Sequence, residues 1–374
     1  MSTSPFMTPS HRRRRREVAS RRRRRRRAVF TVAIVLALTA AVVVMAFAGP
    51  GAAHESTAAA HRRSNAHAAT ATLPAARTPT AALEHATRSP IGLPLGTPAL
   101  ALKGIGNPAE DPVHPPFHEQ PHAGILFNLD TGQVLWQHNA YTRLMIASLT
   151  KMMTALLTVT SAPADTPVLI TREAVDMPGS KVGVLPLGKH VKLETLLYGL
   201  LLPSGNDAAV ALAQHVAGTV DKFVTRMNDE AAKLGLGCTH YSSPSGYYDQ
   251  YNFSCAADLA LLAHDDLEQP RIASVVHTYS AVLPFPIKGG KLYLYNNNPL
   301  LIYGYPGVTG MKTGETEAAG RCLVATAERH GVRLGVVLLH SPDPGTQASY
   351  LLDRGFESVY HQAPVPAPAM PPGA

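Results

Sequence analysis

Two separate parts of the chain carry short apolar runs bounded by turn residues, and such runs predict β-strands. Asp130-Thr131-Gly132 joins the first two runs, which predicts a hairpin, and Arg329-His330-Gly331 joins the last two. The predicted strands cover residues 123–129, 133–138, 307–313, 320–327 and 332–340.

Between these strand groups, apolar residues recur every three or four positions, which is the period of an amphipathic helix. Thr219 or Asp221 is placed to cap one helix, which Gly235 and Gly237 end, and Ser254 is placed to cap another. The predicted helices cover residues 148–159, 193–202, 207–217, 221–234 and 254–264, with a last one near 347–360. Strands at both ends with helices between them predict an α/β (α+β) fold with one antiparallel sheet, flanking helices and a helical lobe.

An uncharged apolar segment of 21 residues lies at positions 28–48. As a helix it would measure about 30 Å, the thickness of the hydrocarbon core of a bilayer. The arginine runs at 12–16 and 21–27 precede it, which predicts a cytoplasmic N-terminal tail at residues 1–27. We therefore predict an uncleaved membrane anchor, with a signal segment cleaved after Ala46-Phe47-Ala48 as the alternative. Either way, the remainder is exported.

The net charge of +8 is concentrated in these arginine runs, which hold twelve of the 34 Lys and Arg residues. From residue 28 onward, 22 basic residues face 25 acidic ones, so the rest of the chain is mildly acidic. The runs adjoin the predicted membrane span and lack interleaved aromatic residues. Anionic lipid head groups are therefore the expected partner of the arginines, and nucleic acid is not.

Residues 49–121 are rich in Ala, Pro, Thr and His and show no sustained apolar period. This composition predicts a disordered spacer. The folded domain is expected at residues 122–362, followed by a Pro-rich tail at 363–374.

Three cysteines suit an exported protein without making it a disulfide scaffold. Cys238 and Cys255 lie 17 positions apart in a stretch rich in loop residues, and we predict a disulfide between them. Cys322 lies within a predicted apolar strand, where it is expected to act as a small buried apolar residue.

The first motif with chemical potential is Ser148-Leu149-Thr150-Lys151, at the start of a predicted helix. Residues three apart on a helix share a face, so the amine of Lys151 can reach the hydroxyl of Ser148. A lysine that burial and a second cation hold neutral can take the proton of such a serine. Taken alone, Ser-x-x-Lys is common by chance.

Two further short motifs follow. Ser204-Gly205-Asn206 lies between two apolar helices and supplies a second hydroxyl and an amide. Lys312-Thr313-Gly314 ends a strand, where Gly314 lets a substrate backbone lie against the strand edge. Lys312 and Thr313 then offer a positive charge and a hydroxyl to a terminal carboxylate.

Ser-x-x-Lys, Ser-x-Asn and Lys-Thr-Gly, in this order, form the motif set of penicillin-binding proteins and class A β-lactamases. The surrounding sequence resembles the low-molecular-mass D-alanyl-D-alanine carboxypeptidases, and the similarity covers about residues 122–362. The stretches that carry it are 123–135, 146–156, 201–209, 236–262 and 310–316.

The resemblance implies a β-lactamase/transpeptidase-like fold with a five-stranded antiparallel sheet. It also implies removal of the terminal D-Ala from peptidoglycan stem peptides ending in D-Ala-D-Ala, through an acyl-enzyme that β-lactams also form. Ser148 would be the nucleophile, Lys151 its base and Ser204 a proton relay. Asn206 would bind the substrate amide, and Lys312 and Thr313 its carboxylate.

The oxyanion hole that the resemblance implies consists of the backbone N–H groups of Ser148 and Glu315, a type of donor worth about 3 kcal/mol. Two features depart from the family pattern. Glu315 stands where many relatives have His, and an arginine that some relatives carry beyond the last strand is absent from residues 334–348. Both concern the binding of an anionic substrate more than the class of reaction.

Three alternatives remain open from the sequence. A class A β-lactamase would need a glutamate to activate the deacylating water, but Glu230 lies in a predicted surface helix. A non-catalytic wall-binding protein on the same fold and a D,D-endopeptidase are the others. No cofactor or metal is expected, because the His-Glu-x-x-His pattern at residues 118–122 contains Pro121, which opposes the helix that a zinc site requires.

Overall fold

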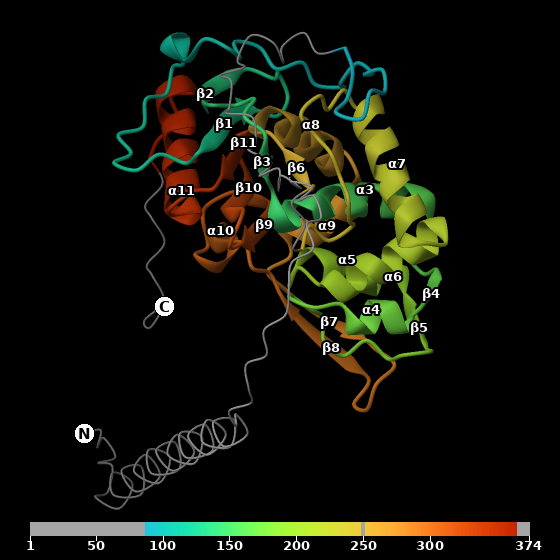
Figure 1. Cartoon of the computed structure of the whole chain (residues 1–374). Coiled ribbons are helices and arrows are strands. Elements are labelled where there is room, and N and C mark those ends of the chain that lie inside the picture. The colour runs from blue at the N-terminus through green and yellow to red at the C-terminus, as the bar shows by residue number, and fades with distance from the viewer. Residues whose placement is uncertain (1–86, 248–250, 365–374) are drawn as a thin grey trace, which may run out of the picture. The chain divides into compact units, whose positions relative to one another are not determined.

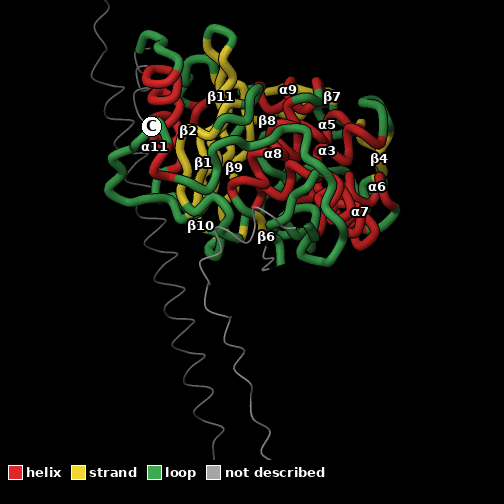
Figure 2. The backbone as a smooth tube through the Cα atoms, turned by 90° about the horizontal axis from the view of Figure 1, so that it is seen from above, coloured by secondary structure: helices red, strands yellow, loops and turns green. Residues whose placement is uncertain are grey.

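The computed structural model describes residues 87–247 and 251–364, which form a central sheet with helices on both faces. Figure 2 shows the sheet between α11 on one side and most of the other helices on the opposite side. The sheet is five-stranded and antiparallel, with the order β2-β1-β11-β10-β9. Its strands are β1 (Ala123–Asn128), β2 (Val134–His138), β9 (Val308–Thr316), β10 (Gly320–Arg329) and β11 (Val332–Leu339).

Most helices lie on the face of the sheet opposite α11, where they form the lobe that the sequence predicts (Figure 1). Their bounds are α3 (Lys151–Ser161), α4 (Arg172–Asp176), α5 (Leu193–Leu201), α6 (Asn206–Ala217), α7 (Val220–Lys233), α8 (Ala256–Leu267) and α9 (Pro270–His277). The shorter elements are the 3-10 turns η1 (Pro108–Glu110) and η2 (Ala147–Thr150), and α10 (Pro299–Ile302). On the other side of the sheet, α11 (Pro344–Arg354) continues into a π-helical turn, η3 (Gly355–Val359).

Strand β1 explains why both faces of the sheet are covered. All six of its residues are buried. Ile125 and Phe127 belong to the core beneath the helical lobe, whereas Leu126 belongs to the core beneath α11. Successive side chains of a strand point to opposite faces, so an uninterrupted apolar run needs cover on both sides. Burying each of these side chains contributes about 1.5–3 kcal/mol.

The first and last strands of the folded region lie side by side at the centre of the sheet. Ala123 of β1 pairs with Leu339 of β11, and the register continues to Asn128 opposite Leu334. Distant parts of the sequence are thereby joined in one antiparallel sheet, which confirms the predicted fold class.

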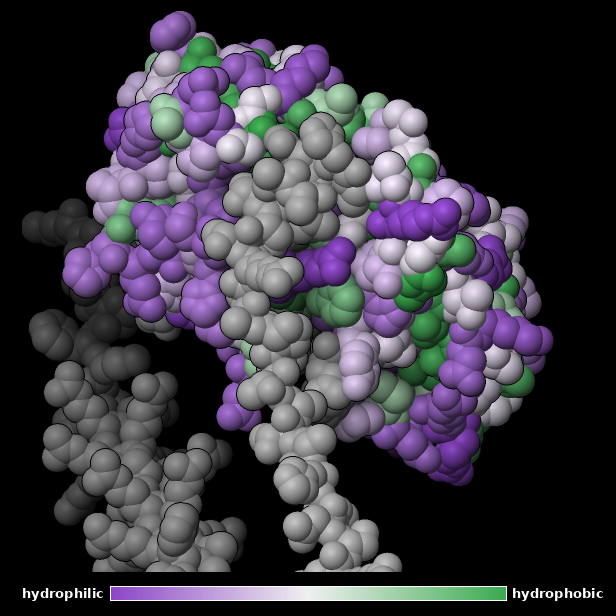
Figure 3. Space-filling view, turned by 45° about the horizontal axis from the view of Figure 1, so that its top comes forward, coloured by the Kyte–Doolittle hydropathy of each residue, from purple (hydrophilic) through white to green (hydrophobic). Residues whose placement is uncertain are grey.

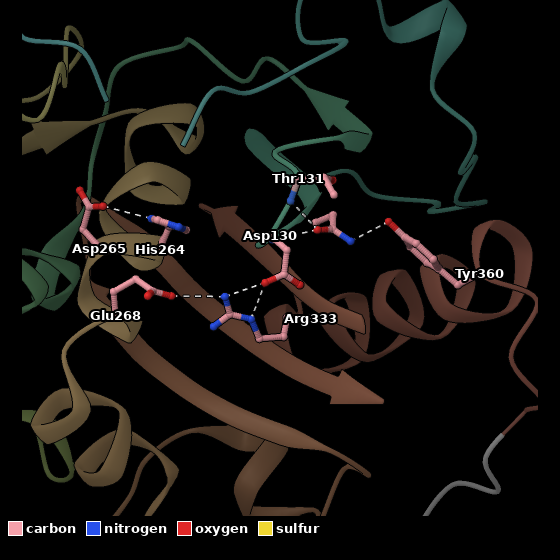
Figure 4. A network of polar contacts seen from close by, with 8 residues as sticks. Asp130, Thr131, His264, Asp265, Glu268, Arg333 and Tyr360 are labelled. Atoms are coloured by element: carbon pink, nitrogen blue, oxygen red, sulfur yellow. Dashed lines mark hydrogen bonds and ion pairs between the residues drawn. The ribbon is translucent and has the colours of Figure 1, made fainter. Parts of the chain in front are cut away.

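A network of ion pairs lies at the end of the sheet near the first hairpin turn (Figure 4). Arg333 of β11 lies between two carboxylates, 2.6 Å from Asp130 and 3.3 Å from Glu268. On the adjoining strand, Asn128 donates a hydrogen bond of 2.7 Å to the hydroxyl of Tyr360. The turn is therefore tied both to the last strand and to the segment after α11.

Three two-stranded sheets lie outside the central one. They pair β3 (Leu144–Met145) with β6 (Phe253–Ser254), β4 (Pro167–Leu169) with β5 (His190–Lys192), and β7 (Ser280–Pro284) with β8 (Lys291–Tyr295). The sequence patterns did not predict them, nor did they predict α9.

The β7–β8 hairpin carries the exposed rings of Tyr293 and Tyr295. On the face that Figure 3 shows, hydrophilic areas predominate and hydrophobic areas are smaller.

The folded region begins earlier than His122, contrary to the predicted spacer at residues 49–121. Val113 is buried, and its N–H donates to the carbonyl of Leu135 at 3.0 Å. Asp111 accepts hydrogen bonds from the backbone and the side chain of Gln137, while burial raises the pKa of this carboxyl. Residues 103–117 thus pack along β2, whereas Gly96 lies at the end of α7, where its N–H donates to the carbonyl of Ala232. These isolated contacts leave no periodic signal in the sequence.

One of the two expected helix caps is confirmed, and the other differs. Helix α8 has Cys255 as its N-cap, because Ser254 belongs to β6 and pairs with Leu144. The cap of α7 is Thr219, whose hydroxyl accepts from the N–H of Lys222 at 3.3 Å.

Cys238 and Cys255 are linked by a disulfide, and Cys322 is a buried free thiol within β10. Both arrangements agree with what the sequence led us to expect.

The predicted cytoplasmic tail, the apolar segment at 28–48 and most of the Pro-rich tail lie outside the described residues. Among the residues that are described, no helix has both the length and the apolar character needed to cross a membrane.

Candidate active site

The predicted nucleophile lies in a tight turn directly before a buried helix. Ser148 belongs to η2, and Lys151 is the first residue of α3. The Nζ atom of Lys151 lies 2.8 Å from the Oγ atom of Ser148. Ala147 has a φ of 47°, a left-handed conformation that is uncommon for a residue with a Cβ atom and usually held by its surroundings. The single helix expected from residue 148 is therefore a 3-10 turn followed by a helix.

The side chain of Lys151 is completely buried and is surrounded by oxygen atoms. It makes hydrogen bonds of 2.8 Å to Ser148 Oγ, to Asn206 Oδ1 and to the carbonyl oxygen of Ser245. Burial lowers the pKa of Lys151 well below its ordinary value, and the nearby cation of Lys312 lowers it further, against a smaller opposite effect of Asp207. The surroundings therefore favour a neutral amine at this position.

The second motif lies on the link between α5 and α6. Ser204 has a φ of 66°, and its Oγ is buried without a hydrogen-bond partner among the residues described. Asn206 is held at both ends of its amide, because Oδ1 accepts from Lys151 and Nδ2 donates to the carbonyl of Pro178 at 2.8 Å. A free hydroxyl thus lies beside a rigidly oriented amide.

A loop that sequence reasoning did not single out is fastened to this second motif. Asp207 accepts hydrogen bonds from the N–H groups of Val182 and Gly183, at 2.9 and 3.0 Å. The N–H of Asn206 donates to the carbonyl of Ser180 at 2.7 Å. The signal for Asp207 was its place in the family-like stretch 201–209, whereas the loop carried no recognisable pattern.

Strand β9 brings the third motif to the nucleophile. It is an edge strand of the sheet, and its Gly314 lies against η2. A Cβ atom on Gly314 would come 2.8 Å from the carbonyl oxygen of Ile146 and 3.2 Å from the N–H nitrogen of Ser148. Only glycine lets the strand approach the nucleophile this closely.

Lys312 and Thr313 differ in their exposure to the site. Lys312 is buried, and its ammonium group donates a 2.8 Å hydrogen bond to the carbonyl of Thr313. Burial lowers the pKa of Lys312 to about 7. Thr313 is half-buried and faces the cleft.

A cleft of about 500 Å³ joins the three motifs. Its wall includes five of the predicted site residues: Ser148, Ser204, Thr313, Gly314 and Glu315. Lys151, Asn206 and Lys312 are buried and do not line it. The residues of the wall that sequence reasoning missed include Ser180, Asn297, Tyr303, Arg321 and Asp343.

The described residues offer one cluster of potential metal ligands, formed by Cys238, Cys255 and Asp258. Its two sulfur atoms are joined in the disulfide, so they are not available as thiolates. The segment with the His-Glu-x-x-His pattern forms a bend rather than a helix.

Sequence comparisons place this chain among known enzymes. The family model described as D-alanyl-D-alanine carboxypeptidase matches residues 110–343. The chain is 34% identical over 256 residues to the D-alanyl-D-alanine carboxypeptidase DacF of Bacillus subtilis, an alignment that covers 66% of this chain and 64% of that protein. It is 35% identical over 240 residues to the D-alanyl-D-alanine carboxypeptidase DacB2 of Mycobacterium tuberculosis, covering 62% and 81% of the two chains.

Comparison with solved structures agrees with the sequence relatives. The crystal structure of the Streptomyces K15 DD-transpeptidase superposes with a TM-score of 0.61 at 32% sequence identity. The match covers 65% of this chain and 99% of that one. The D-alanyl-D-alanine carboxypeptidase DacD of Francisella tularensis gives a TM-score of 0.59 at 27% identity, covering 64% of this chain and 71% of that one.

Proposed function

Because this chain belongs to the D-alanyl-D-alanine carboxypeptidase family, we propose that it removes the terminal D-alanine from peptidoglycan stem peptides through an acyl-enzyme on Ser148. The observation that carries the proposal is the buried amine of Lys151, which lies 2.8 Å from the hydroxyl of Ser148. None of the catalytic residues that the family pattern requires is missing, which speaks against a non-catalytic wall-binding protein.

The hydrogen bonds around Lys151 suit a general base. The amide oxygen of Asn206 and the carbonyl of Ser245 can only accept, so they engage two N–H groups of the amine. In the neutral state the remaining lone pair points to the third partner, the hydroxyl of Ser148. Ser148 then donates its proton to Nζ as its oxygen attacks the carbonyl carbon of the penultimate D-Ala.

The remaining steps return the proton to the leaving group. The backbone N–H groups of Ser148 and Glu315 stabilise the oxyanion, and Gly314 keeps these two donors close together. When the tetrahedral intermediate collapses, the C–N bond breaks and Lys151 gives its proton to the departing amine of D-alanine. The unpartnered hydroxyl of Ser204 is the group proposed to relay that proton. Water then hydrolyses the ester, with Lys151 again accepting a proton.

The substrate is proposed to lie along β9 as an added strand, since this strand ends the sheet. Asn206 would bind the amide of the substrate backbone. Thr313 would face its terminal carboxylate, and the positive charge of the buried Lys312 would attract that carboxylate from behind the cleft wall. β-Lactams would acylate the same serine.

The test is covalent labelling of the purified protein with a penicillin. Intact mass should rise by the mass of one antibiotic, and Ser148→Ala should abolish the adduct. Ser349→Ala is the matched control, because Ser349 lies on α11 outside the cleft and donates to the carbonyl of Gly345. An unlabelled wild-type protein, or labelling that persists in Ser148→Ala, would refute the assignment.

The N-terminal segment indicates where in the cell the protein acts. We propose that residues 28–48 anchor the protein in the cytoplasmic membrane, with the catalytic domain on the outer side, where its substrate lies. The support is the length of the uncharged segment and the arginines before it.

A further inference from the structure

Arg321, which has no part in the proposed reaction steps, lines the cleft beside strand β9. Arg321 is exposed on β10 and shares the cleft wall with Ser148 and Thr313. The sequence offers no arginine in residues 334–348, where some relatives carry one for the substrate carboxylate. The cleft therefore contains a guanidinium that belongs to none of the three motifs.

The pairing of β9 with β10 puts Arg321 within reach of Thr313. Thr313 lies opposite Leu323, and Arg321 precedes Leu323 by two positions. Side chains two positions apart on a strand point to the same face. Arg321 is therefore the diagonal neighbour of Thr313, at a separation of about 7–8 Å that a long side chain spans. Its guanidinium can reach the space beside the threonine hydroxyl.

No ion pair or side-chain hydrogen bond of Arg321 is found within residues 87–247 and 251–364. Two other arginines of the same sheet behave differently, because Arg329 pairs with Asp353 and Arg333 with Asp130 and Glu268. Arg321 thus presents a cation that no carboxylate of the described residues neutralises in a direct pair.

Lys312, the other cation of the carboxylate-binding motif, is poorly suited to supply a permanent charge. It is buried and donates to the carbonyl of Thr313, and burial lowers its pKa to about 7. A guanidinium stays protonated at any physiological pH and offers two parallel N–H donors to a carboxylate.

We propose that Arg321, together with Thr313, binds the C-terminal carboxylate of the substrate and makes the enzyme selective for peptides that end in a free carboxylate. This inference rests on the proposed carboxypeptidase function. Glu315, the direct partner of Arg321 in the strand register, lies on the same face and opposes the binding of an anion there. Asp343, the other acid of the cleft wall, accepts the N–H of Thr346 as the cap of α11.

The experiment pairs a change in the enzyme with a change in the substrate. Arg321→Ala, Arg321→Lys and the wild type are assayed with a peptide ending in D-Ala-D-Ala and with the same peptide amidated at its C-terminus. For the free acid, Arg321→Ala should raise KM by about 10- to 100-fold and change kcat much less, since a bond to a charged group is lost. For the amide, the wild type and Arg321→Ala should have the same KM. If turnover of the amide is too slow, its Ki against the free acid takes the place of KM.

Two further variants test the charge at this position. Arg321→Lys should recover part of the affinity for the free acid, and Glu315→Gln should lower its KM because a competing anion is removed. Arg333→Ala is the matched control and should leave KM unchanged, since this arginine lies outside the cleft wall. Melting curves establish that each variant is folded.

The possible results separate this inference from the proposed function. Equal effects of Arg321→Ala on the acid and the amide, or no effect on either, would overturn the role of Arg321 while wild-type activity stands. Absence of wild-type turnover, together with no penicillin adduct, would instead overturn the carboxypeptidase function itself.

Discussion

Lys151 and Lys312 are both buried at one site, yet they are proposed to work in opposite protonation states. Lys151 must be neutral to accept a proton from Ser148, and burial together with the charge of Lys312 lowers its pKa. Lys312 attracts the substrate carboxylate only when it is protonated, and its pKa is lowered to about 7. Because one lysine must be neutral and the other protonated, replacing each of them by arginine tests both roles.

Replacing each lysine by arginine should have unequal effects. Lys151→Arg should lower kcat/KM by about 10²- to 10⁴-fold, because a guanidinium stays protonated and cannot act as the base. Lys312→Arg should be milder, since that position requires only a positive charge. Both are measured by steady-state kinetics with a D-Ala-D-Ala peptide, and equal tolerance of the two changes would contradict the assignment of the base.

The pH profile distinguishes the two roles further. In the wild type, kcat/KM should rise with pH as Lys151 loses its proton and fall as Lys312 loses its own near pH 7. In Lys312→Arg the fall should move to higher pH or disappear, because arginine keeps its charge. An unchanged alkaline limb would mean that a group other than Lys312 produces it.

Among the elements, those that the sequence predicted best carry strong local signals. The strands β1, β2, β9, β10 and β11 were predicted from apolar runs and turn residues, and the structure confirms all of them. The motif residues were found because Ser-x-x-Lys, Ser-x-Asn and Lys-Thr-Gly have fixed spacing. Structural elements and motif residues that depend on one short segment can therefore be predicted from the sequence of that segment.

Features that depend on how elements meet were not predictable in this way. The carbonyl of Ser245 reaches Lys151 across 94 positions, and Arg321 enters the cleft only through the register of β10 with β9. The left-handed conformations of Ala147 and Ser204 are imposed by the surrounding structure, because neither residue type favours them. The hairpin β7–β8 was missed although its strands, with five residues each, are as long as β2.

The disulfide between Cys238 and Cys255 fastens α8 to the loop that follows α7. The loop it closes includes the carbonyl of Ser245 that accepts from Lys151. Closing a loop of this length contributes about 3 kcal/mol in the entropy model, so Cys238→Ala with Cys255→Ala should lower Tm by about 5–10 °C.

Calorimetry of the double variant measures this loss, and Cys322→Ala is the control for removing a cysteine that has no disulfide. A double variant as stable as the wild type, or peptide mapping that finds both thiols free in the exported protein, would contradict the expected stabilisation.

For the whole molecule, the position of the first described residues changes the expected layout. Val113 and Asp111 pack against β2, and the N–H of Gly96 donates to the carbonyl of Ala232 in α7. A catalytic domain expressed on its own should therefore begin before residue 87 rather than at His122. This leaves residues 49–86 as the longest spacer that the sequence can supply between the apolar segment and the described domain.

Residues 28–48 are expected to attach the protein to the cell. The uncharged segment 28–48 is long enough for a bilayer, and the arginines before it favour a cytoplasmic N-terminus. We therefore expect the mature protein to keep residue 28 onward and to pellet with membranes through high-salt washing, since hydrophobic insertion, unlike electrostatic adsorption, resists salt. Replacing residues 1–48 by a cleavable signal should release a soluble domain that still binds penicillin. N-terminal sequencing decides between the two outcomes: a mature end at Gly49 or Ala52, with activity in the culture fluid, would make the segment a signal peptide.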